Sequence, residues 1–121
     1  MFKNGDLVFL ANSETSHAIE LVVEVKEMSE HFIVADKFIA IHKVHSGNGE
    51  MNYQGLPDGG LVSNRSILTN TASEVTFNLH KFDLFGIVTN SEIMEQFSKT
   101  TSKIIHPTQA KKVLLRDNHI V

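Results

Sequence analysis

Two long apolar runs lie near the start of the chain, over residues 19–25 and 32–44, and a polar joint at residues 26–31 separates them. Both runs are rich in Ile, Val and Phe, which favour strands because β-branched and aromatic side chains pack well on a pleated surface. In the first run, apolar side chains recur at every second position, with Val22 as the exception. The pattern predicts two long antiparallel strands, with one face of the first on a core and the other in water.

The second run is interrupted at Asp36, which predicts a bulge or a sharp bend. Strong bending is how a small sheet closes on itself. Residues 7–10, 61–68, 75–79 and 84–88 are also strand-like. We therefore expect an all-β protein with a C-terminal helix, built as a small, strongly bent, five-stranded antiparallel barrel.

Between these strands lie two connections of different character. Residues 45–60 are polar and glycine-rich, which is typical of either a mobile loop or an extended hairpin tip. Residues 80–83 leave room only for a very tight connection between the last two strands.

After residue 90 the spacing of apolar residues changes from every second position, typical of a strand, to the three- and four-residue spacing of a helix. Asn90 or Ser91 can cap a helix, and acidic residues follow in its first turns, where they favour the positive end of the helix dipole. We expect residues 1–90 to form the barrel and residues 91–121 to form a helix and tail packed on the same domain. The apolar residues at helical spacing are Ile93, Met94, Phe97 and Ile104, and Pro107 is expected to end the helix.

Composition agrees with one compact domain, since the chain has 121 residues of which 41% are hydrophobic. No run approaches the roughly 18–20 apolar residues of a membrane span, so we expect a soluble, cytoplasmic protein without a membrane partner. The absence of cysteine excludes disulfides and thiolate chemistry. A formal charge of −3 argues against non-specific binding of polyanions by the chain as a whole.

Candidate catalytic and metal-binding residues are few. His42 and His45 could ligate zinc or copper, but on a strand their spacing sends the two rings to opposite faces. Glu20 and Glu24 could form a carboxylate pair, but no partner cavity is indicated and a solvated strand face explains them better. Ser91 has no nucleophile motif around it. We therefore expect no enzymatic activity, no cofactor and no metal.

A binding surface is the stronger expectation, because turns at residues 30–31, 36–37 and 80–82 would cluster at one end of a small barrel. Cations beside an aromatic ring suit the stacking and phosphate contacts of single-stranded nucleic acid. The interpretation that we favour for these two residues is the simpler one, in which Phe82 faces the core and Lys81 only makes its turn soluble. The candidate nucleic-acid-binding residues are His31, Lys37, His80, Lys81 and Phe82.

Five bent strands, a polar joint between the second and third, and a very tight turn before the fifth resemble the Sm/LSm family over about residues 6–89. A C-terminal signature, residues 92–97 followed by 100–107, also resembles Sm-like proteins of marine phage (cyanophage) origin, which implies the host cytoplasm. The resemblance implies a cyclic homo-oligomer of about five to seven subunits. In the family, strand four of one subunit pairs with strand five of the next. The resemblance further implies that the ring binds single-stranded RNA.

The chain departs from the family at three places. It begins with a strand rather than a helix, lacks the glycine of strand two, and has residues 80–83 where the family has an Arg-Gly pair that helps to hold uridine. In the joint before strand three, Glu30 and His31 replace the family's Met-Asn. A ring-shaped structural or adaptor protein, or one that sequesters a small molecule, is therefore the alternative to nucleic-acid binding.

Overall fold

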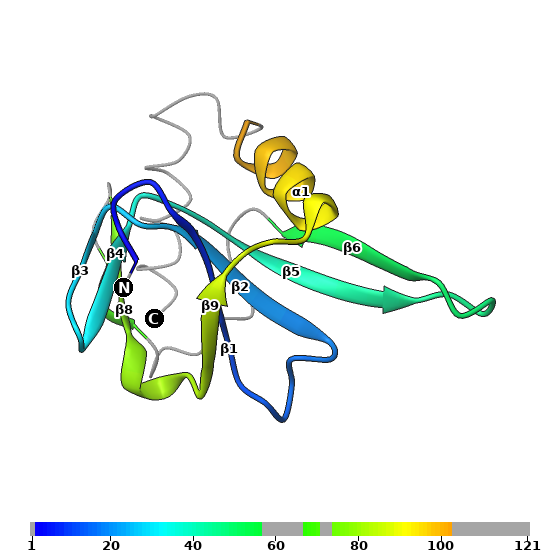
Figure 1. Cartoon of the computed structure of the whole chain (residues 1–121), viewed down its shortest axis with the longest axis horizontal. Helices are drawn as coiled ribbons and strands as arrows, with labels where there is room; N and C mark the ends of the chain where they lie inside the picture. Colours follow the sequence, from blue (N-terminus) through cyan, green and yellow to red (C-terminus); the bar gives the residue numbers. More distant parts are fainter. Residues whose placement is uncertain (1, 57–66, 71–73, 103–121) are drawn as a thin grey trace.

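The computed structural model describes residues 2–56, 67–70 and 74–102. Its strands fall into two antiparallel sheets, and a single α-helix follows the last strand of the described chain (Figure 1). The elements are β1 (Leu7–Ala11), β2 (Ile19–Glu24), β3 (Glu27–Met28), β4 (Phe32–Ala35), β5 (Lys37–His45), β6 (Met51–Leu56), β7 (Ile67–Asn70), β8 (Val75–Asn78), the 3₁₀ turn η2 (Leu79–Lys81), β9 (Leu84–Ile87) and α1 (Ser91–Ser102).

The larger sheet has the strand order β6-β5-β2-β1-β9, and the smaller sheet has the order β3-β4-β8-β7. Two bent strands connect them, because β2 continues into β3 and β4 continues into β5 with only one or two residues between. At the first bend the backbone N–H of Lys26 donates to the carbonyl of Val34 at 2.9 Å, so pairing continues from one sheet into the other. The bend predicted at Asp36 is confirmed.

A first core lies between the two sheets. Its buried residues come from β1, β4, β8, η2 and the strand β2 with the residue after it, and the phenyl ring of Phe38 meets that of Phe77 edge-on at 5.4 Å between centroids. Burial of apolar surface is the main force that holds such sheets together. These residues are Val8, Leu10, Leu21, Val23, Val25, Ile33, Ala35, Val75, Phe77 and Leu79.

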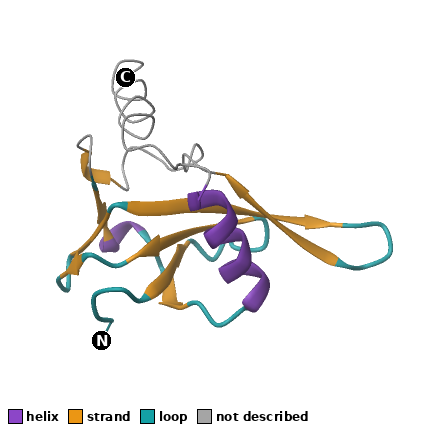
Figure 2. Ribbon diagram, turned by 90° about the horizontal axis from the view of Figure 1, so that it is seen from above, coloured by secondary structure: helices purple, strands orange, loops and turns teal. Residues whose placement is uncertain are grey.

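A second core lies on the opposite face of the larger sheet, under α1 (Figure 2). It explains why Val22 interrupts the alternation of β2. The side chain of Val22 is fully buried on the helix side while its neighbours Leu21 and Val23 face the first core. The prediction that this strand has a solvated face was therefore wrong. The second core contains Val22, Ile39, Ile41, Val88, Ile93 and Phe97.

Helix α1 begins where the sequence predicted. Oδ1 of Asn90 accepts from the backbone N–H groups of Glu92 at 2.8 Å and Ile93 at 3.2 Å, which makes Asn90 the N-cap. Ile93 and Phe97 point into the second core, whereas Met94 is 41% exposed, which its helical spacing did not predict. The helix packs closely on β6, because the backbone N–H of Gly55 donates to Oε1 of Gln96 at 3.3 Å.

Residues 45–60 were predicted as a mobile loop or a hairpin tip, and the described part is a hairpin. β5 and β6 pair from Ala40 and Leu56 out to His45 and Met51, and the end of this hairpin extends beyond the other strands of the larger sheet (Figure 1). At its tip, Gly49 adopts a positive φ of 85°, which glycine reaches without a Cβ clash. Predictions for residues 57–66, Ile104 and Pro107 lie outside the described residues.

The five-stranded closed barrel predicted from the sequence is replaced by these two sheets. Within the described ranges, β9 pairs with β1, and β7 pairs with β8, but β9 and β7 do not pair with each other. The two sheets are therefore not closed into a barrel by strand pairing. In the described part of the chain, no helix has the length and apolar character needed to cross a membrane.

Candidate functional site

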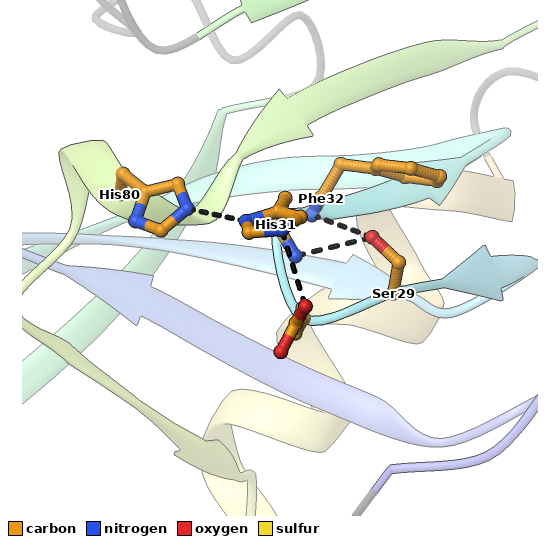
Figure 3. A network of polar contacts seen from close by, with 5 residues as sticks. Ser29, His31, Phe32 and His80 are labelled. Carbon is orange, nitrogen blue, oxygen red and sulfur yellow. Dashed lines mark hydrogen bonds and ion pairs between the residues drawn. The ribbon is translucent and has the colours of Figure 1, made fainter.

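Two histidines from distant parts of the chain meet at one end of the smaller sheet. Nδ1 of His31, in the turn between β3 and β4, lies 2.7 Å from Nε2 of His80 in η2 (Figure 3). Their ring centroids are 5.0 Å apart and the ring planes are inclined by 33°. The structure thus brings together two of the five residues predicted to bind nucleic acid.

Local hydrogen bonds hold both backbones. Oγ of Ser29 accepts from the N–H groups of His31 at 3.1 Å and Phe32 at 3.3 Å, which fixes the turn. Oδ1 of Asn78 accepts from the N–H of His80 at 3.1 Å and caps η2. The N–H of Leu79 donates to the carbonyl of His31 at 3.0 Å, so the turn and η2 are joined directly.

The carboxylate of Glu30, the imidazole of His31 and the imidazole of His80 form a row of three side chains. Oε1 of Glu30 lies 3.2 Å from Nε2 of His31, the ring nitrogen that does not contact His80. A carboxylate accepts from an N–H, so this contact assigns the Nε2–H tautomer to His31 when its ring is neutral. Nδ1 of His31 then presents a lone pair, and Nε2–H of His80 donates to it. The side chains of His31 and Glu30 are 62% and 78% exposed, so solvent reaches the row.

The other three predicted residues are placed differently. Lys81 is exposed in η2, next to His80. Phe82 is partly buried and packs against the first core, as the interpretation favoured from the sequence had it. Lys37 follows the far end of β4, and a strand advances about 3.3 Å per residue, so it lies on the order of 15 Å or more from His31.

A polar contact joins the loop between β1 and β2 to Asp83, the residue before β9. The carboxylate of Asp83 accepts from the backbone N–H of Ser13 at 2.7 Å and from its hydroxyl at 2.6 Å. Both bonds stabilise the ionised form and lower the pKa of Asp83. Asp83 is therefore a fixed negative charge two residues from Lys81, and the site is not a purely basic patch.

The other chemical candidates are dispersed. His42 and His45 are exposed on β5, three residues apart, so their side chains leave opposite faces of the strand. Glu20 does not pair with Glu24; its Oε1 lies 2.8 Å from Nζ of Lys43, and both side chains are largely buried. The solvated face favoured from the sequence was therefore wrong for Glu20, because β5 supplies a lysine that pairs with this carboxylate.

Two residues that position the site, Ser29 and Asn78, were missed in the sequence. Their signal is local: each stands two residues before a histidine and accepts a hydrogen bond from that histidine's N–H, as Ser and Asn commonly do in turns. The contact between the two histidines spans 49 positions and has no local signal.

Comparisons of the chain with protein-family models, with curated proteins and with solved structures found no match.

Proposed function

We propose that the chain is a non-catalytic, Sm-like protein that assembles with copies of itself through sheet edges and binds single-stranded nucleic acid near His31, His80 and Lys81. The observation that supports it best is the topology. Two bent strands connect the sheets, and a single 3₁₀ turn joins β8 to the edge strand β9. This order of bent strands and a tight last connection is what the resemblance to the Sm/LSm family implies.

Strand β9 supplies the surface for assembly. It is an edge strand whose outer backbone groups have no partner strand within the described residues, and it carries three exposed apolar side chains: Leu84 at 39%, Phe85 at 49% and Ile87 at 45%. Such an edge tends to pair with another chain. On the acceptor side, β7 already pairs with β8, so a second copy would add beside β7 rather than β8, unlike in the family.

The assembly predicts a specific effect of Phe85→Glu. A charge at the centre of β9 opposes burial of this edge, so we expect the wild-type oligomer to dissociate toward monomers. Light scattering after gel filtration measures the molar mass, and circular dichroism verifies the fold. Met94→Glu is the matched control, because Met94 is 41% exposed on α1 and away from the edge. A monomeric wild type, or an unchanged mass for Phe85→Glu, would contradict assembly through β9.

Nucleic-acid binding predicts a different effect for two lysines. Removing one phosphate contact lowers the magnitude of the slope of the logarithm of the binding constant against the logarithm of the salt concentration by about one. We expect Lys81→Ala to weaken binding of a labelled uridine-rich or adenine-rich oligonucleotide and to reduce this slope, measured by fluorescence anisotropy at several salt concentrations. Lys37→Ala, at the other end of β4, should change it less. A flat titration of the wild type at low salt would exclude this function.

The second candidate is an adaptor protein, or one that sequesters a small molecule, without nucleic-acid binding, and two observations favour it. Phe82 packs on the first core, and the carboxylate of Glu30 stands beside His31. Both reduce what the site offers to bases and phosphates. Oligomerisation without oligonucleotide binding would support this second function.

A further inference from the structure

We propose that His31 and His80 are the two protein ligands of a site for a divalent transition-metal ion that prefers tetragonal coordination. Cu²⁺ is the ion that fits this site best, and Glu30 orients the ring of His31 within the site. This inference goes beyond the proposed function, because it requires neither assembly nor nucleic acid. It rests on the spacing of two ring nitrogens, on the tautomer that Glu30 imposes, and on the hydrogen bonds that hold the backbone.

The separation of the nitrogens fits a square arrangement. Two imidazoles bound at about 2.0 Å in neighbouring positions of a square plane have nitrogens about 2.8 Å apart, whereas a tetrahedral ion needs about 3.3 Å. Nδ1 of His31 and Nε2 of His80 are 2.7 Å apart. The rings therefore need to rotate toward a common point but need not separate. Copper also heads the affinity order of divalent ions for nitrogen ligands.

Glu30 leaves the correct nitrogen free. Metal-binding histidines usually donate the other ring N–H to a carboxylate, which fixes the tautomer and the orientation of the ring. Oε1 of Glu30 lies 3.2 Å from Nε2 of His31, and Nδ1, on the other side of the ring, faces His80. Nδ1 of His31 thus has a lone pair for the metal once the ion replaces the hydrogen bond from His80. For Nε2 of His80 to bind as well, its proton moves to Nδ1 of the same ring, which is the other neutral tautomer of imidazole.

The backbone around the two ligands is already ordered. Ser29 and Asn78 accept from the N–H groups of His31 and His80, and Leu79 donates to the carbonyl of His31. Binding therefore costs little ordering of the chain, which favours affinity.

No group of three or more His, Cys, Asp or Glu side chains within the described ranges is placed to hold a metal ion. Water completes the coordination, and the exposed rings leave room for it.

The test is a titration of the full-length protein with Cu²⁺ against a glycine competitor, with electron paramagnetic resonance of the bound ion. We expect one tight site with tetragonal parameters and coupling to two imidazole nitrogens. His31→Gln and His80→Gln should each weaken this site on the order of 10²-fold, because the second ligand no longer acts within the same molecule, and should leave one nitrogen coupling fewer. Glu30→Gln should weaken it about 10-fold while both couplings remain.

His42→Gln is the matched control, since it removes an exposed histidine on β5 and should leave the tight site unchanged. Circular dichroism of each variant verifies the fold. The proposal is overturned if the wild type has no saturable site, if only one imidazole couples, or if His31→Gln and His80→Gln bind as tightly as His42→Gln. In those cases the two rings share a hydrogen bond and nothing more.

Discussion

Replacement of Phe77 by alanine is expected to lower the free energy of unfolding by about 3–5 kcal/mol. Phe77 is the largest fully buried side chain of the described residues, and its ring packs edge-on against Phe38 between the two sheets. Deletion of the ring removes its transfer free energy and leaves a cavity that neighbouring strands cannot fill. Since domains of this size are stable by about 5–15 kcal/mol, the variant should lose a large part of its stability.

Urea denaturation followed by circular dichroism measures this loss, with the midpoint shifted and the slope unchanged. Phe77→Leu is the graded control, because it retains most of the apolar volume and should cost less than about 1.5–2 kcal/mol. Equal stabilities of the alanine and leucine variants would contradict the packing of this core.

Gly55→Ala is the second large effect, and we expect a loss of about 1–3 kcal/mol from overpacking. Gly55 lies on β6 under α1, where an added Cβ would overlap Oγ1 of Thr100 and approach Cβ of Thr100 to 3.2 Å and the carbonyl oxygen of Gln96 to 3.4 Å. Thr100 is itself 4% exposed and cannot swing into solvent. The helix must therefore move away from the larger sheet, which loosens the second core.

A double-mutant cycle isolates this contact. Thr100→Ala removes the overlapping oxygen but keeps the tight Cβ contact, so Gly55→Ala should cost less, though still something, in that background. Gly47→Ala is the matched control. No atom lies within 4 Å of a Cβ added there, and the change should stay within about 0.5 kcal/mol. Strict additivity in the cycle would mean that α1 does not pack on Gly55.

The fold was predictable where local pattern decides it. β1, β2, the bend at Asp36, β9 and the start of α1 all lie where alternation, turn chemistry or a capping residue placed them. Val22 was misinterpreted because a helix more than sixty positions later covers its face, and no window around β2 contains that information. Closure of the barrel likewise depends on which distant edges pair.

The candidate site was predictable in part. The turns at residues 30–31 and 80–82 were expected to meet, and the contact between His31 and His80 brings them together. The bend at Asp36 was expected beside them, but an extended β4 carries it away. Phe82 could not be assigned from sequence, because a ring in a tight turn can face either the core or solvent.

The covering of the larger sheet on both faces determines how the molecule opens. β2 has a partner strand on each side and cores above and below it, so its amide hydrogens should exchange last, through global unfolding. The core above Val22, however, is closed by Ile93 and Phe97 of α1. Fraying of this helix would bare the sheet without breaking any of its strand pairs. The helix after the last strand therefore sets the local stability of a strand near the beginning of the chain.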